Sequence, residues 1–216
     1  DWSSDVCSSD LNKIGGMNMS KRLICSESWL RNKIHVKVYL PVPGSIDKLE
    51  APAMGNSPME RDENIMKFAE EMWFPQYFRA VKRIIDVYER SEMPLRYIIG
   101  QEIDIFPMIE RVGMYSVFSG KISMDNDSML DISIVGSGAQ IFGHEMGHKL
   151  LCVKESNELL ENVQEYFGTT EKWAHEIIAE LTGEIVANDD TAVKISFIDE
   201  RTKEYFKRQI LKLAWQ

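Results

Sequence analysis

The chain has few of the features that mark disulfide-stabilised, membrane-spanning or nucleic-acid-binding proteins. Three of its 216 residues are cysteine, too few and too widely spaced for a disulfide framework. No run reaches the ~18 consecutive apolar residues of a membrane helix. Lys and Arg number 25 against 34 Asp and Glu, giving a net charge of −9. We therefore expect no nucleic-acid partner and no membrane surface as partner.

The first 16 residues are expected to lie outside the native protein. Residues 1–11 resemble the in-frame translation of a sequencing adapter, so Met17 or Met19 is the more natural start. The sequence after Met17 lacks the apolar core of a secretory signal, which makes the cytoplasm the default expectation. Residues 17–216 have the length and apolar content of one domain. Within it, the Pro/Gly-rich stretch 41–58 is expected to be a loop.

The hydrophobic pattern of the chain predicts a mixture of helices and strands. Strands are expected at residues 34–40, 95–101, 115–124 and 129–135, the last two joined by a turn at 125–128. Helices are expected at residues 59–92 with a break at Pro75, then at 139–153, 156–167, 169 or 170 to about 187, and 199–215. The expected caps are Ser156 and Thr169 or Thr170, and Gly168 ends a helix. The fold class is therefore α+β.

The residues most suggestive of chemistry are His144 and His148, which stand four apart in Gly-His-Glu-Met-Gly-His. On a helix they share one face, so both imidazoles can reach one zinc ion at ~2.0–2.1 Å. Glu145 lies beside them, where it can take a proton from a zinc-activated water. A surface helix with two solvated histidines is the alternative. The apolar back of this helix, with Phe142 and Met146, argues against that alternative.

A third zinc ligand is expected, because catalytic zinc usually has three protein ligands and one open position. The only histidine after His148 is His175, so we expect an acid on a following helix. Glu176 and Glu180 lie one turn apart on one face. Glu176 can ligate the metal while Glu180 accepts the free N–H of a ligating histidine, or Glu180 can itself be the ligand. Without a metal, the two acids and Glu184 would form a solvated acidic stripe.

Residues 140–184 resemble the gluzincins, zinc peptidases in which an H-E-x-x-H helix is followed by a glutamate helix of the form E-x-x-[A/S]-[D/E/N]. The Glu-Ile-Ile-Ala-Glu sequence that starts at Glu176 fits this form. It is similar to the glutamate helix of lethal-factor-like peptidases and of small peptidases from phage and mobile-element systems. The resemblance implies a zincin-like fold in which a small mixed or antiparallel sheet packs on a central H-E-x-x-H helix. A glutamate helix and a C-terminal helix follow, with Glu176 as third ligand and Glu180 behind it.

The expected activity is that of a zinc-dependent endopeptidase acting on a peptide or protein substrate, with Glu145 as general base. A donor to the oxyanion is also expected, and Tyr166 and His175 are the candidates. Alternatively, Tyr166 packs in the core and His175 is exposed to solvent, and neither then contacts the substrate. The strand at 115–124 or 129–135 is expected to offer an edge to an extended peptide. A catalytically inactive zinc-binding regulatory or interaction domain is the alternative function.

One cysteine of the chain follows the histidine pair closely. Cys152 lies four residues after His148, on nearly the same stripe of the helix. A metal held by the two histidines would sit about one turn back, too far for a short thiol on the same helix. We therefore expect Cys152 to be a buried free thiol rather than a ligand.

Overall fold

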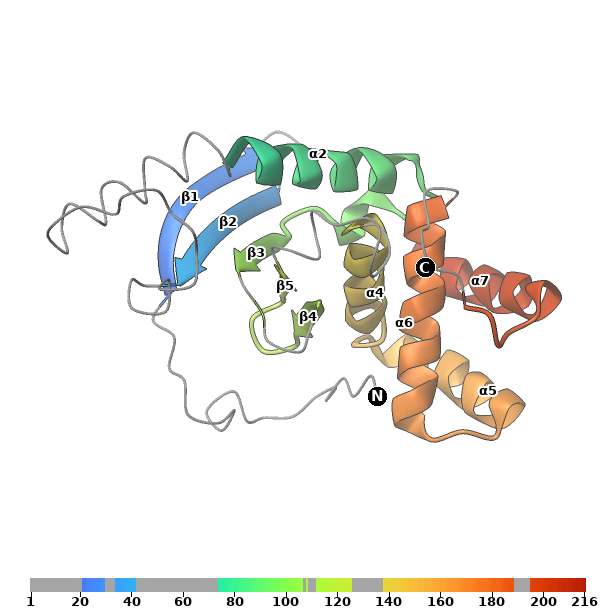
Figure 1. Ribbon diagram of the computed structural model, residues 1–216. Helices are drawn as coiled ribbons and strands as arrows, with labels where there is room; N and C mark the ends of the chain where they lie inside the picture. Colours follow the sequence, from blue (N-terminus) through green and yellow to red (C-terminus); the bar gives the residue numbers. More distant parts are fainter. Residues whose placement is uncertain are drawn as a thin grey trace, which may run out of the picture.

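The computed structural model describes residues 21–29, 34–41, 74–106, 108, 112–125, 138–188 and 195–216, and these residues form an α+β fold (Figure 1). The strands are β1 (Lys21–Trp29), β2 (Ile34–Pro41), β3 (Glu102–Phe106), β4 (Gly113–Ser116) and β5 (Lys121–Asp125). The helices are α2 (Phe74–Arg90), α4 (Gly138–Leu150), α5 (Asn157–Phe167), α6 (Glu171–Ala187) and α7 (Glu200–Trp215). Two short 3₁₀ helices, η2 (Leu95–Tyr97) and η3 (Lys154–Ser156), complete the described elements.

The strands form one mixed five-stranded sheet with the order β1-β2-β3-β5-β4. The three inner strands are parallel to each other, and the two outer strands are antiparallel to their neighbours. Strand β4 is thus an edge strand in the described part of the chain. It contacts the helix α4, which carries the histidine pair. Among the described residues, the sheet order therefore places a strand edge beside the helix that carries the histidines.

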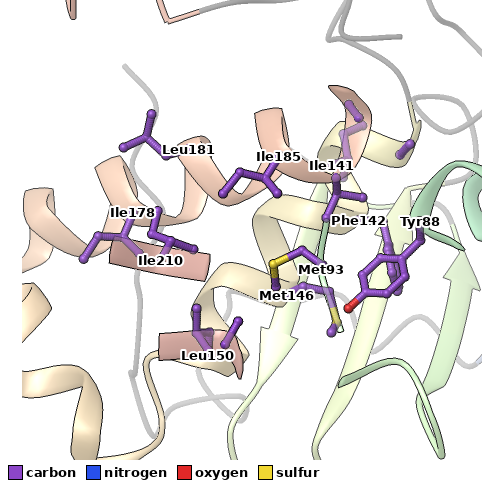
Figure 2. Close-up of a cluster of buried hydrophobic side chains, with 14 of the residues drawn as sticks. Tyr88, Met93, Ile141, Phe142, Met146, Leu150, Ile178, Leu181, Ile185 and Ile210 are labelled. Carbon is purple, nitrogen blue, oxygen red and sulfur yellow. The ribbon is translucent and has the colours of Figure 1, made fainter. Parts of the chain in front are cut away.

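Helix α4 is the centre of the fold, lying between the sheet and α6 in Figure 1. Helix α2 packs on α4, and both α5 and α7 pack on α6. The apolar side of α4, with Phe142, Met146 and Leu150, is fully buried. Tyr88 of α2 and Ile178 of α6 belong to the same core (Figure 2). None of the described helices is long and apolar enough to cross a bilayer.

Small residues let α4 and α6 approach closely, as Ala179 and Gly183 predict. A Cβ added at Gly143 would lie 3.0 Å from the Cα of Gly183. A Cβ added at Gly147 would lie 2.6 Å from the Cα of Ala179. Both contacts are closer than side chains normally allow. The backbones of the two helices therefore touch where α4 presents its histidines.

Replacing Gly147 with alanine is expected to destabilise the protein by about 1–3 kcal/mol, because the new methyl group overpacks the α4–α6 contact. Helix propensity alone predicts the opposite, a gain of about 1 kcal/mol from Gly to Ala. The backbone contact should dominate, since the Cα of Ala179 cannot move without moving α6. Thermal unfolding measures the effect, and a higher melting temperature in the variant would show that the two helices are not in close contact.

The prediction of a strand at residues 95–101 is wrong. These residues form η2 and a turn that ends at Gly100, whose φ is +79°. Lys149 of α4 holds this segment, because its Nζ donates to the carbonyl of Tyr97 at 2.7 Å and to Oε1 of Gln101 at 2.9 Å. The strand β3 begins only after this turn, where Ile103 and Ile105 alternate with polar residues. No strand was expected at these residues.

The prediction of a single strand at residues 115–124 is also wrong, because this segment forms a hairpin of β4 and β5. Gly120, with a φ of +66°, lies in its turn and donates its N–H to the carbonyl of Ser116. The turn expected at 125–128 cannot join β5 to a neighbouring strand, since β3 and β4 occupy both sides of β5. Residues 129–135 lie outside the described residues, as do 41–58 with the exception of Pro41.

The predictions for strand β2 and the helices after residue 138 are confirmed to within a few residues. Thr170 caps α6 by accepting the N–H of Trp173, and Asp199 caps α7. Gly168 ends α5 in the left-handed region, with a φ of +58°. The cap role of Ser156 is wrong, because its hydroxyl donates to carbonyls of the preceding turn instead. Pro75 is the second residue of α2, so the break expected there falls at the start of this helix, and residues 59–73 lie outside the described residues.

Candidate active site

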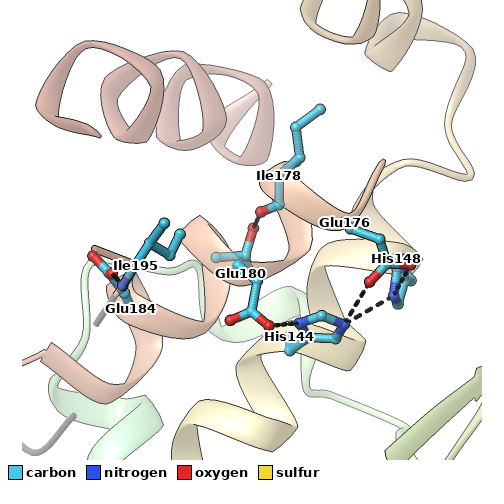
Figure 3. Close-up of polar contacts among 8 residues, drawn as sticks. His144, His148, Glu176, Ile178, Glu180, Glu184 and Ile195 are labelled. Atoms are coloured by element: carbon cyan, nitrogen blue, oxygen red, sulfur yellow. Dashed lines mark hydrogen bonds and ion pairs between the residues drawn. The ribbon is translucent and has the colours of Figure 1, made fainter. Parts of the chain in front are cut away.

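The two histidines of α4 face each other across one helical turn. Their Nε2 atoms are 3.1 Å apart, and both rings are partly buried. Figure 3 shows the rings on the side of α4 that faces α6. The i, i+4 spacing produces this arrangement locally, since such residues lie above one another on a helix. The pair therefore offers two ring nitrogens to a common point.

Glu176 of α6 joins the pair from the opposite side (Figure 3). Its Oε2 lies 3.4 Å from Nε2 of His144, and its Oε1 lies 3.9 Å from Nε2 of His148. Ligand atoms from all three residues lie within 4.8 Å of one another, so the group could hold a metal ion.

The distances within this cluster can be compared with those between the ligand atoms of tetrahedral zinc. Two ligand atoms bound at ~2.0–2.1 Å to one such ion lie ~3.3 Å apart. The separations between His144 and its two neighbours in the cluster, 3.1 and 3.4 Å, are close to this value. The residues present therefore fit a metal of this size, and only the carboxylate oxygen that faces His148 must move closer.

Glu180 lies one turn beyond Glu176 and contacts the other nitrogen of His144. Its Oε1 is 3.3 Å from Nδ1, and its side chain is about 43% exposed. An acceptor at Nδ1 fixes the ring orientation and leaves Nε2 free for a metal. The two glutamates of α6 thus occupy different positions around His144: one beside the histidine pair, and one behind it.

The two imidazoles have opposite pKa shifts. Burial would lower the pKa of His144, but hydrogen bonds to Glu176 and Glu180, with the nearby charge of Glu145, raise it to about 10. Burial and the positive charge of His144 lower the pKa of His148. At neutral pH the metal-free cluster therefore holds an imidazolium at His144 between carboxylates, beside a neutral His148. The proton occupies the place that a cation would take.

Metal binding is expected to become stronger as the pH rises, because a metal must displace the proton of His144. The raised pKa of His144 stabilises the metal-free fold fully below about 6.5, and this contribution is lost as pH rises toward about 10. The melting temperature with zinc minus that with chelator should thus increase from pH 6.5 to 8.5. A difference that stays constant over this range would contradict a protonated His144.

Glu145 lies on the same helix but outside the ligand cluster, against strand β4. It is only 4% exposed, and its Oε2 has no hydrogen-bond partner among the described residues. Burial raises its pKa to about 7, although the charge of His144 and a hydrogen bond from the backbone N–H of Tyr115 act in the opposite direction. A carboxylate with a pKa near neutrality can both accept and return a proton. The hydrophobic pattern of the chain does not indicate these contacts from β4.

The two candidates for the oxyanion donor, Tyr166 and His175, differ in their exposure and in their position relative to the cluster. Tyr166 is about 59% exposed, and its hydroxyl is hydrogen-bonded to that of Thr202 on α7. His175 is partly buried and close enough to His148 to lower the pKa of that residue. Of the two, His175 is the one whose charge acts on the histidine pair.

Cys152 differs from its prediction in one respect. It is a free thiol, but it is exposed rather than buried. Its Sγ contacts the carbonyl of His148 at 3.4 Å. Helix α4 ends at Leu150 instead of continuing to 153, so Cys152 lies on the turn after the helix, where no core covers it. It is not a member of the described metal-ligand cluster.

Comparison with known proteins adds no relative: no family model, curated protein or solved structure matches the chain. Function must therefore be argued from the chemistry of the cluster itself. That cluster combines two imidazoles and one carboxylate from two helices with a separate buried carboxylate beside them.

Proposed function

We propose that the protein is a zinc-dependent metallopeptidase. The observation that carries this proposal is the convergence of His144, His148 and Glu176 on one point, with Glu145 buried next to them. Two histidines and one glutamate form a donor set that catalytic zinc uses in hydrolases, with the fourth position left to water. An exposed acidic surface does not explain this arrangement, since Glu145 is 4% exposed and the side chains of the three cluster residues are between 11% and 17% exposed.

Zinc is proposed over magnesium and calcium because of the donor chemistry. Imidazole suits zinc, copper, iron and nickel, whereas magnesium and calcium prefer sites made only of oxygen. When bound, zinc would supply Lewis acidity, lowering the pKa of a water molecule to ~7 and polarising a carbonyl group. Peptide-bond hydrolysis needs both effects.

The protein's own residues would divide the remaining tasks. The carboxylate of Glu145 accepts the proton of the attacking water and passes it to the leaving amine. Glu180 holds the ring of His144 from behind, as the 3.3 Å contact at Nδ1 favours. His175 is the remaining candidate for a hydrogen bond to the developing oxyanion, because its charge acts on the histidine pair.

Strand β4 is the proposed docking edge for an extended peptide substrate. The N–H of Asp125 donates to the carbonyl of Val112 at 3.0 Å, which makes residues 112 and 114 face β5. By the alternation of an antiparallel ladder, Gly113 and Tyr115 then direct their backbone groups away from the sheet. An added peptide strand would pair with those outward groups that Glu145 does not engage, such as the carbonyl of Tyr115.

The same features support a gluzincin-like architecture as part of the proposal. A mixed sheet lies on the helix with the histidines, a glutamate-bearing helix follows, and a C-terminal helix packs on that one. Glu176 takes the position of the third ligand, and Ala179, three residues later, lies at the close contact of the two helices.

Cleavage of a peptide library by the purified protein tests the function. Cleavage should require zinc, stop with a chelator and return when zinc is restored. A protein that carries zinc but cleaves no member of a diverse library would instead favour the inactive zinc-binding domain. A protein that takes up no zinc would contradict both the peptidase and the inactive zinc-binding domain.

A further inference from the structure

We propose that strand β4 positions the general base: the backbone N–H of Tyr115 holds the carboxylate of Glu145, and the absence of a side chain at Gly113 makes room for it. This inference rests on the proposed function for its catalytic meaning, although the contacts themselves do not depend on it. Gly113 and Tyr115 are positioning residues, since they act on the reaction through Glu145.

The space at Gly113 is occupied by Glu145. A Cβ built at Gly113 would lie 2.6 Å from Oε1 and 3.1 Å from Cδ of Glu145. The other of the three nearest atoms is the Cγ2 of Ile141, at 3.0 Å. Any residue with a side chain would therefore push directly against this carboxylate. Since a glutamate side chain is flexible, the carboxylate would move before the backbone of either element does.

The N–H of Tyr115 is available because β4 is an edge strand. Its neighbour β5 pairs with the groups of residues 112 and 114, so the N–H of Tyr115 points outward, toward α4. Glu145 accepts this hydrogen bond. The bond engages one carboxylate oxygen, while Oε2 has no hydrogen-bond partner in the described part of the chain. Oε2 is thus the oxygen positioned to take a proton.

The consequence is a division of labour between two elements. Helix α4 fixes the backbone of Glu145, and β4 fixes its carboxylate through one hydrogen bond and one steric limit. The outward groups of β4 that Glu145 does not engage, such as the carbonyl of Tyr115, would be left for the substrate, so the same strand would align both base and substrate. Misplacing a catalytic group by about 1 Å costs on the order of 100-fold in rate, which sets the expected effect.

The first test is Gly113→Ala in the zinc-loaded, full-length protein. We expect kcat to fall about 10- to 100-fold with KM changed less than threefold, because the base is displaced and the ligands are not. Zinc content and melting temperature should stay close to wild type. If zinc content or stability falls in parallel with kcat, the glycine has only a structural role and the proposal is overturned.

Two further variants separate the contacts of Gly113. Glu145→Asp is one methylene shorter, so the added methyl group should cost less in that background than in wild type. Ile141→Leu removes the second close atom and should not restore the activity of Gly113→Ala. Restoration by Ile141→Leu would assign the effect to helix packing and contradict the proposal.

Amide hydrogen exchange tests the contact without any activity assay. The amide of Tyr115 should be protected in wild type and lose that protection in Glu145→Ala, while the inward-facing amide of Met114 keeps it. Unchanged exchange at Tyr115 would overturn the inference even if the protein is a peptidase. Lost protection in a protein without peptidase activity would uphold the contact and reject the proposed function.

Discussion

Replacing Glu145 with glutamine is expected to lower peptide hydrolysis by about 10²–10⁴-fold, the usual contribution of general acid–base catalysis. Glutamine has nearly the same shape, so the N–H of Tyr115 still finds an oxygen acceptor. The amide cannot take up a proton from water near neutral pH. The ligand cluster does not include Glu145, so zinc content should remain about one per chain. Single-turnover cleavage with metal analysis of the same sample measures both quantities.

A matched control is Glu165→Gln on α5, which makes the same chemical change at an exposed position. It should keep wild-type activity and zinc content. Glu145→Gln with a rate within tenfold of wild type would contradict the assignment of the general base. Loss of zinc in Glu145→Gln would show instead that this carboxylate supports the metal.

Replacing Glu184 with alanine is expected to destabilise the fold by about 3–5 kcal/mol, the cost of breaking a buried ion pair on one side. Its carboxylate lies 3.4 Å from Nζ of Lys203 and 2.8 Å from Nζ of Lys207, and it accepts the N–H of Ile195 at 2.8 Å. The side chain of Lys203 is only 2% exposed. Without Glu184 its ammonium would stay buried with little compensation, so α7 would detach from α6 more easily.

Glu200→Ala is the control for this prediction, since Glu200 contacts the same ammonium of Lys203 at 3.2 Å but is 79% exposed. An exposed ion pair contributes only about 0–1 kcal/mol. Urea unfolding of both variants compares the two partners directly. Similar losses of less than about 1 kcal/mol in both would mean that Lys203 finds water when Glu184 is absent.

The helices could be predicted because their signals are local. The apolar stripe of α4, the cap at Thr170 and the stop at Gly168 each lie within the element that they define. Some of the errors fall where pairing is not local. Nothing within residues 95–101 indicates that Lys149, about 50 positions later, donates to the carbonyl of Tyr97 and to the side chain of Gln101. Likewise, the pairing of β3 with β5 arises from contacts across the sheet, whereas the β4–β5 hairpin has a local turn at Gly120 that was missed.

In the candidate site, too, the local features could be predicted from the sequence and the contacts between distant elements could not. The spacing of His144 and His148 is sufficient to align two imidazoles on any helix. The approach of Glu176 depends on two helices in contact, and the small residues Ala179 and Gly183 were the indication of this in the sequence. The contact of β4 with Glu145 had no comparable indication, because the strand itself was assigned incorrectly. The role of Gly113 becomes apparent only when Glu145 is known to lie against it.

Metal analysis of the purified protein tests the central claim most directly, with His144→Ala, Glu176→Ala and Glu171→Ala measured in parallel. Glu171 lies on the same helix as Glu176 but is exposed, so it serves as the control. We predict about one zinc per chain in wild type and Glu171→Ala, and none retained in the other two variants. Wild-type protein that binds no zinc after reconstitution, or Glu176→Ala that keeps it, would contradict the three-residue metal site.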